Sequence, residues 1–125
     1  MVRLLNAIAL LLFLLSQSAF AADCGGAGIP VNPCKRCRIA GAVSTHRDQS
    51  CIRGLRENNA NNVILGFSVA KQASHGRVAA SGSSFTYTPA KGFVGTDRFS
   101  IEIDFLSGNK DVLVNFIDYT MDVTP

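Results

Sequence analysis

The sequence predicts an all-β fold, an antiparallel β-sandwich. Apolar and polar residues alternate over several segments, turn residues separate those segments, and no stretch shows a convincing helical period. About six or seven short strands spaced roughly ten residues apart are typical of a sandwich of the immunoglobulin type. The chain contains no tryptophan, so the tryptophan-on-disulfide core of antibody domains is absent.

The N-terminus has the pattern of a secretory signal peptide. Arg3 precedes an apolar run from Ala7 to Leu15, and the small-residue triplet Ala19-Phe20-Ala21 follows. The run is shorter than the ~20 residues that span a bilayer, and no later segment is apolar for long enough. We therefore expect residues 1–21 to be removed and the mature chain, without a transmembrane segment, to be exported to the periplasm or the cell exterior.

The mature chain is expected to form one domain, because 104 of the 125 residues remain after position 21. Residues 22–37 are rich in Cys, Gly and Pro and are expected to form an N-terminal segment stapled to the domain by disulfides. Residues 38–125 are expected to form the β-sandwich itself. Lipid attachment at Cys24 is an alternative, although Asp23 stands where that signal needs a small residue.

Four cysteines lie close to the start of the mature chain, at Cys24, Cys34, Cys37 and Cys51. In an exported protein an even number of cysteines indicates disulfides, here two, and three pairings are open. A bridge between Cys34 and Cys37 closes a very small ring, so the sequence favours pairing each of them outward to Cys24 and Cys51. Redox chemistry at the CxxC motif and a zinc site of four thiolates are the alternatives.

Basic residues are concentrated in the first part of the mature chain, where positions 22–96 carry nine basic and three acidic residues. If the disulfides draw several of them onto one face, that face would attract an anionic partner such as a polysaccharide, or an envelope or extracellular protein. Export and a small net charge argue against nucleic acid. The candidate patch consists of Lys35, Arg36, Arg38, Arg47, Arg53 and Arg56.

The strands of the first half are predicted from alternation and from the turns between them. Ile39 to Ser44 is expected to be a strand, and His46 to Asn62 a long loop that holds one helical turn at most, at Cys51 to Glu57. The next strand is expected to place one set of side chains in the core: Val63, Leu65, Phe67 and Val69. A turn, a short strand from Arg77 to Ala80 and a hairpin at Ser81-Gly82-Ser83 follow.

The second half shows the cleanest alternation. Phe85 and Tyr87 share one face of a strand, and from Asp97 to Phe105 four apolar residues alternate with polar ones that should face water. In the last strand Val112, Val114 and Phe116 are expected to face inward. The apolar phase then shifts by one residue, which predicts a β-bulge near Phe116 and Ile117.

The stretch HGRVAASGSSFTYTPAKGFVGTDRFSIEI resembles the signature of bacterial Ig-like and cadherin-like extracellular modules. The resemblance covers about Val63 to Val123, and it implies a sandwich that serves adhesion, spacing or ligand presentation. Calcium-dependent relatives carry an acidic segment before the first of these strands, whereas here Glu57 is the only acid of GLRENNANN, so no metal or cofactor is expected. The residues that match the motif are His75, Gly76, Tyr87, Pro89, Gly92, Phe93, Gly95, Asp97 and Phe99.

The sequence therefore favours a non-catalytic module for binding, adhesion or cell-envelope structure. It has no nucleophile-elbow motif, and Asp97 is expected to accept backbone N–H bonds from the preceding turn instead of acting in catalysis. His46 and His75 are too few for a copper or zinc cage. Two alternatives stay open. One is a small thiol-disulfide or metal-binding protein that uses Cys34 and Cys37. The other is an assembly subunit that adds a strand at an exposed sheet edge, and a lysine placed in the strand from Val112 to Phe116 would test it.

Overall fold

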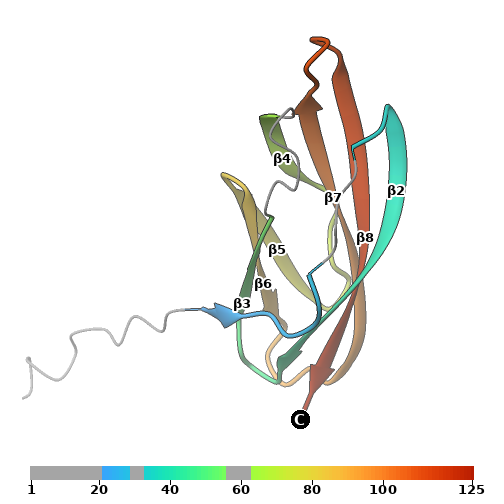
Figure 1. The fold of residues 1–125 in the computed structure, drawn as a ribbon. Coiled ribbons are helices and arrows are strands. Elements are labelled where there is room, and N and C mark those ends of the chain that lie inside the picture. Colours follow the sequence, from blue (N-terminus) through green and yellow to red (C-terminus); the bar gives the residue numbers. More distant parts are fainter. Residues whose placement is uncertain (1–20, 29–32, 56–62) are drawn as a thin grey trace, which may run out of the picture.

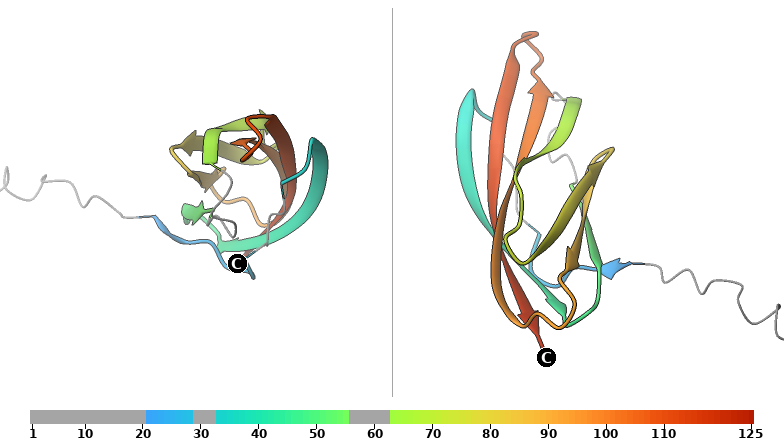
Figure 2. Two further views of the ribbon diagram at one scale, coloured as in Figure 1. Left: turned by 45° about the horizontal axis from the view of Figure 1, so that its top comes forward. Right: turned by 180° about the vertical axis from the view of Figure 1, so that it is seen from behind.

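The computed structural model describes residues 21–28, 33–55 and 63–125. In these residues it forms two four-stranded sheets that face each other, with the strand orders β1-β3-β6-β5 and β2-β8-β7-β4 (Figure 1, Figure 2). The expected all-β sandwich is confirmed. Apart from its last residue, Ala21, the expected signal peptide lies outside the described residues. The strands of the described chain are β1 (Ala22–Asp23), β2 (Arg36–His46), β3 (Cys51–Gly54), β4 (Val63–Lys71), β5 (Gly76–Ser81), β6 (Ser84–Pro89), β7 (Gly95–Leu106) and β8 (Val112–Thr124).

Two of the strand pairs are parallel, β1 with β3 and β2 with β8, and the others are antiparallel. Because β2 pairs with β8 while the next strand, β3, joins the opposite sheet, the chain crosses between the layers after His46. Strand β8 therefore lies between β2 and β7. From Val114 to Phe116 the strand is paired on both sides, so this part is not the exposed edge that strand addition would need, whereas Val112 and Leu113 pair with β7 but with no residue of β2.

The core lies between the two sheets and is built around four aromatic rings. Phe99 stacks on Tyr119 and on Tyr87, with ring centroids 5.3 Å and 5.7 Å apart, and Phe85 meets Phe99 edge to face. The alternation expected for β7 is confirmed, since Phe99 and the apolar residues at positions 101, 103 and 105 are all buried. The opposite face of β7 is not uniformly in water, because Ser100 is also buried.

Strand β8 differs from its expected orientation. Its pairing with β7 runs without interruption from Gly95↔Val123 to Leu106↔Val112, so the predicted bulge near Phe116 is absent. Side chains therefore alternate between the two faces along the whole strand without a shift. The expectation that Val112, Val114 and Phe116 face inward is wrong. The inner positions are Leu113, Asn115, Ile117, Tyr119, Met121 and Val123.

The orientation of strand β4 also differs from the expected one, here because a register shift is present that the sequence did not predict. A register shift between Ile64 and Gly66 changes its phase, so Ile64 packs against the core together with Phe67 and Val69. Val63 and Leu65, expected inside, are 57% and 54% exposed. Alternation by itself cannot reveal a bulge, because the extra residue becomes visible only through the pairing with β7.

The segment before β2 joins both sheets. Strand β1 pairs with β3, and immediately after it the backbone of Gly25 exchanges two hydrogen bonds with Ser44 of β2, at 2.8 Å and 3.1 Å. Cys51, expected in a loop or helical turn, begins the strand β3. The residues assigned from sequence to a separate N-terminal segment thus contribute a strand and sheet contacts on one side of the sandwich.

The disulfides differ from the favoured pairing. Cys24 is bonded to Cys51, with 4.7 Å between their Cα atoms, and Cys34 is bonded to Cys37. The parallel pairing of β1 with β3 places Ala22 opposite Cys51 and brings Cys24 to it. Sequence spacing could not predict this neighbourhood, because it depends on where β1 joins the sheet.

Candidate functional site

The basic residues of the candidate patch are divided by the fold. Lys35, Arg36 and Arg38 stand at the start of β2, whereas Arg47 follows the other end of the same eleven-residue strand. Arg53 belongs to the opposite sheet, where its Nη2 donates to the carbonyl oxygens of residues 24, 25 and 26 at 2.6 Å, 2.9 Å and 3.0 Å. Its guanidinium therefore holds the N-terminal segment in place. Arg56 lies outside the described residues.

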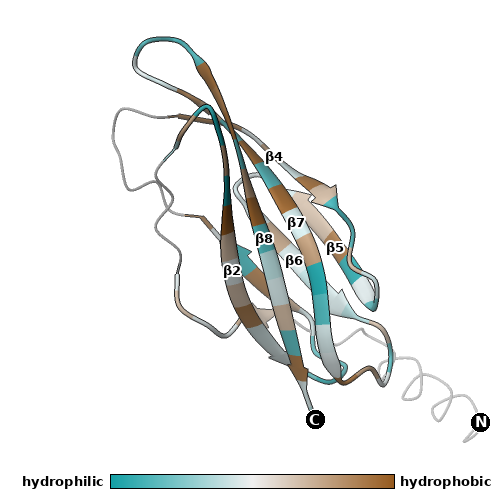
Figure 3. Ribbon diagram, turned by 90° about the vertical axis from the view of Figure 1, so that its right-hand side faces the viewer, coloured by the Kyte–Doolittle hydropathy of each residue, from teal (hydrophilic) through white to brown (hydrophobic). Residues whose placement is uncertain are grey.

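The outer face of the β2-β8-β7-β4 sheet, which points away from the other sheet, is formed by four strands, along which hydrophobic and hydrophilic residues are both present (Figure 3). Residues paired directly across neighbouring strands point to the same face. The register of the strand pairs therefore arranges this outer face in rows across the sheet. The first row starts at β8 and runs through β7 to β4: Val112–Leu106–Val63. The next three rows run from β2 through β8 and β7 to β4: Arg36–Val114–Asp104–Gly66, Arg38–Phe116–Glu102–Ser68 and Ala40–Asp118–Ser100–Lys71.

One end of the outer face is apolar. Val112 is 55% exposed, and Val63, at the other end of the same row beyond Leu106, is exposed to a similar extent. Contiguous exposed apolar residues on a folded domain mark interaction surfaces more often than isolated ones do. We call this region the apolar end; its residues are Val63, Leu65, Leu106, Val112, Val114 and Phe116.

A bidentate ion pair borders the apolar end. Arg38 donates from Nε and Nη2 to the two carboxylate oxygens of Asp118, at 3.0 Å and 2.9 Å, and its guanidinium lies 4.6 Å from the ring centroid of Phe116. The hydroxyl of Ser100 donates to Asp118 at 2.6 Å. The hydrogen bonds from Arg38 and then from Ser100 lower the pKa of Asp118 below its ordinary value, and the same pairing raises the pKa of Arg38.

This ion pair predicts a specific titration behaviour. A lowered folded-state pKa means that Asp118 contributes stability above its unfolded-state pKa, and that this contribution is lost as the pH falls through the folded-state value. The side chains are 58% and 45% exposed, so solvent screens the pair and the effect on stability is small. In a carboxyl NMR titration, Arg38→Gln should raise the pKa of Asp118 toward its ordinary value. Arg98→Gln, which alters an exposed arginine outside the pair, should leave it unchanged; an unaltered pKa in Arg38→Gln would contradict the assignment.

The motif residues form a buried network instead of an open site. The carboxylate of Asp97, 2% exposed, accepts N–H bonds from Ser74 at 3.0 Å and His75 at 3.1 Å. It also accepts from the hydroxyl of Tyr87 at 2.8 Å and from the N–H of Arg98 at 2.9 Å. The main donors come from the turn before β5 and not, as expected, from the turn that precedes Asp97. Burial, followed by this hydrogen bond, raises the pKa of Tyr87 well above its ordinary value.

The remaining motif residues pack around the same turn. The ring of His75 stacks on Phe93, with centroids 4.5 Å apart and planes 3° from parallel. A Cβ at Gly76 would lie 2.9 Å from the ring of Tyr87 and 2.7 Å from the carbonyl oxygen of Thr88, so only glycine fits there. Gly92 adopts a φ of 79° and donates its N–H to the carboxylate of Asp48 at 2.7 Å.

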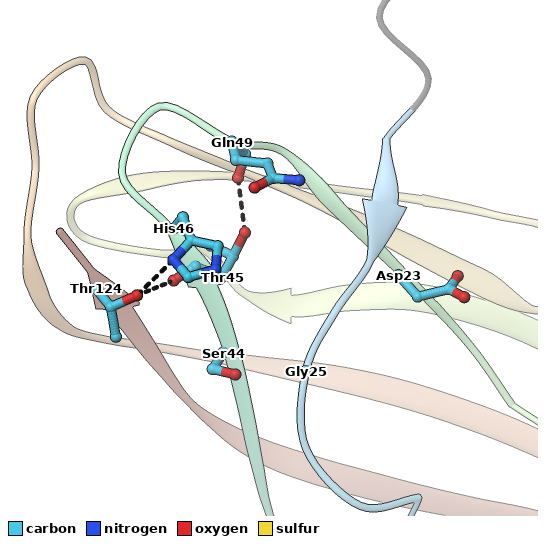
Figure 4. A pocket seen from close by; sticks show the side chains of 7 residues that line it. All are labelled: Asp23, Gly25, Ser44, Thr45, His46, Gln49 and Thr124. Carbon is cyan, nitrogen blue, oxygen red and sulfur yellow. Dashed lines mark hydrogen bonds between the residues drawn. The ribbon is translucent and has the colours of Figure 1, made fainter.

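A shallow polar depression lies between β1 and the end of β2 (Figure 4). Its polar groups bond to one another: His46 Nδ1 lies 2.8 Å from Thr124 Oγ1, and Thr45 Oγ1 donates to the carbonyl of Gln49 at 2.9 Å. The side chain of Asp23 points away from His46 in Figure 4. The arrangement therefore presents no paired acid and base.

The CxxC motif, Cys34 to Cys37, runs into the start of β2. The side chain of Asn115, 3% exposed on the inner face of β8, accepts the N–H of Cys34 at 3.2 Å and donates to its carbonyl at 3.0 Å. Asn115 thus holds the Cys34–Cys37 loop against the sheet. All four cysteines are in disulfides, and within the described ranges no group of three or more His, Cys, Asp or Glu side chains is placed to hold a metal.

The outer face was missed in the sequence because Phe116 and its neighbours were assigned to the core. A signal existed: counting back in steps of two from Val123 places Asn115 and Leu113 inside and Phe116 outside. The polar Asn115 concealed it, since an amide at an inner position is unusual unless it is fully hydrogen-bonded. Its partner, the backbone of Cys34, is 81 residues away in the chain.

The comparisons agree with the fold. No curated protein shows significant similarity to the chain. A family model described as a bacterial Ig domain matches residues 39–115, from β2 into β8, and this range includes Asp97 and the turns that it holds. No helix long and apolar enough to cross a membrane occurs in residues 21–28, 33–55 or 63–125. Because the family model matches more than half of the 125 residues and the two sheets form the expected sandwich, the chain belongs to the bacterial Ig domain family.

Proposed function

We propose that this protein is an exported, non-catalytic Ig-like module that works by binding a protein partner in the cell envelope or outside the cell. The N-terminal signal pattern and two disulfides support export, because disulfides persist in oxidising compartments. The family is one of domains that are typically non-catalytic. The conspicuous polar groups, Asp97 and His46 among them, are occupied by structural hydrogen bonds.

The observation that carries the proposal is the outer face of the β2-β8-β7-β4 sheet. Its apolar end combines an aromatic ring, Phe116, with aliphatic side chains from three strands, and the exposed arginine Arg38 stacks on that ring. Aromatic residues and arginine are enriched where proteins bind one another, and the surrounding charged rows provide a polar rim. The outer face thus has the composition of an interaction surface.

The test compares the accessibility of two single cysteines. Val112→Cys reports on the outer face, and Ala79→Cys, on the exposed side of β5 in the opposite sheet, is the matched control. Each is labelled with a maleimide in dilute purified protein and in intact envelopes of the producing cells. We expect Val112→Cys to react about tenfold more slowly in envelopes, as when nine tenths of the molecules are bound, while Ala79→Cys is unaffected. Equal rates for Val112→Cys in both preparations would refute the proposal.

A further inference from the structure

Charge follows the same order in two successive rows of the outer face. In each row an apolar residue of β8 separates an arginine of β2 from an acid of β7. Read from β2 through β8 to β7, the two rows are Arg36–Val114–Asp104 and Arg38–Phe116–Glu102. In these two rows the outer face is therefore basic on the β2 side of β8, apolar on β8 and acidic on the β7 side.

We infer that the outer face binds a second copy of this chain, through a twofold axis parallel to β8. This inference rests on the proposed function and names its partner. Rotation about such an axis lays β8 on β8 and places β2 of each copy over β7 of the other. Arg38 then faces Glu102 of the second copy and Arg36 faces Asp104, twice over, while Phe116 and Val114 meet their counterparts in the centre. Face-to-face sheets pack with strands aligned to within about 30°, which keeps two adjacent rows in correspondence.

The charged groups have bonding capacity left for this contact. Arg38 uses Nε and Nη2 on Asp118, and its Nη1 donates to no described residue. Arg36 is exposed and forms no ion pair with a described residue. Asp104 carries a buried carboxylate oxygen, Oδ1, that has no hydrogen-bond partner among the described residues. An unpaired buried oxygen is costly, and a guanidinium of a second copy above the half-buried Asp104 side chain would bring the opposite charge close to this carboxylate.

The size of the surface predicts a weak dimer. Three strands at ~4.8 Å spacing and about 20 Å along β8 amount to on the order of 300 Å² of flat sheet. Standard interfaces bury ~800 Å² per partner. We therefore expect a dissociation constant on the order of 100 μM, so that dimers form where the protein is concentrated.

The test is sedimentation equilibrium of the oxidised mature protein from about 10 μM to about 1 mM. Arg38→Glu and Glu102→Arg each place like charges across the twofold axis, so each alone should raise the dissociation constant about tenfold. In an equimolar mixture of the two variants, both cross-axis contacts become complementary again. The mixture should therefore recover wild-type association, and Arg77→Glu on β5 of the opposite sheet should associate as the wild type does.

Arg38→Glu also loses the ion pair with Asp118. The thermal unfolding of each sample is therefore measured by circular dichroism, to show that the variant is folded. If that variant does not fold, Arg36→Glu paired with Asp104→Arg replaces it, because Arg36 faces Asp104 across the axis and has no ion pair with a described residue. A wild type that stays monomeric to about 1 mM, or a mixture that associates no better than its components, would overturn the inference. A monomeric wild type with Val112→Cys still protected in envelopes would leave the proposed function standing with a different partner.

Discussion

Replacing Asp97 with alanine is expected to lower the free energy of unfolding by about 3–5 kcal/mol. Its carboxylate accepts hydrogen bonds from Ser74, His75, Tyr87 and Arg98 and is 2% exposed. Alanine would leave two turn N–H groups and a buried hydroxyl without an acceptor. The effect is therefore larger than the loss of one hydrogen bond, since every orphaned donor keeps its desolvation cost.

Urea unfolding followed by far-ultraviolet circular dichroism measures the loss. Tyr87→Phe removes one of the four donors and should cost about 1–2 kcal/mol. In Asp97→Ala the same tyrosine change should cost much less, because its acceptor is already absent. Asp122→Ala removes an exposed acid of β8 and should stay within about 0.5 kcal/mol of the wild type. A loss below about 1 kcal/mol for Asp97→Ala would show that the turn does not depend on this carboxylate.

Removing the Cys24–Cys51 disulfide by the double change to alanine is expected to cost about 3–4 kcal/mol. The bond joins residues 27 positions apart, whereas Cys34 and Cys37 are 3 apart. A longer closed loop restricts the unfolded chain more, so the matched double change at Cys34 and Cys37 should cost about 2 kcal/mol. Cys24 and Cys51 are also buried, at 6% and 1% exposure, and they hold β1 to the sandwich.

The two double variants are compared by urea unfolding under identical conditions. Loss of Cys24–Cys51 should also expose Arg53, whose guanidinium bonds to the carbonyls of residues 24–26. Amide hydrogen exchange at Ser44 reports this directly, because its N–H bonds to the carbonyl of Gly25 at 3.1 Å. Equal costs for the two disulfides, or a larger cost at Cys34 and Cys37, would contradict the loop-length argument.

The N-terminal segment is held to the domain by more contacts than the disulfides that its composition predicted. Cys24, Gly25 and Arg53 tie the segment to both sheets, through the disulfide, the pairing with Ser44 and three carbonyl hydrogen bonds. Arg53 is therefore occupied inside the molecule, and only Lys35, Arg36 and Arg38 of the described basic set stand together. The basic side of the outer face consists of the last two.

Local pattern sufficed for much of the fold. Strict alternation along β7 predicted its buried face, and the Gly82-Ser83 turn and the strands beside it follow from turn chemistry. The family motif was visible in the sequence as a spacing of residues, but the contacts that require those residues were not. Tyr87, Asp97 and the turn at His75 become one network only when β5, β6 and β7 are brought together.

The sequence by itself determined the β-sandwich class and family, because a period of two and the placement of turn residues are properties of neighbouring positions. Only the tertiary structure decided which face of β8 and β4 is buried and which cysteines are bonded. Those outcomes depend on strand register and on which segments become neighbours. Where apolar residues occupy both faces, as from Val112 to Ile117, alternation cannot say which face is the core. The pairing with β7 decides it, and it leaves Val114 and Phe116 on the surface between the arginines of β2 and the acids of β7.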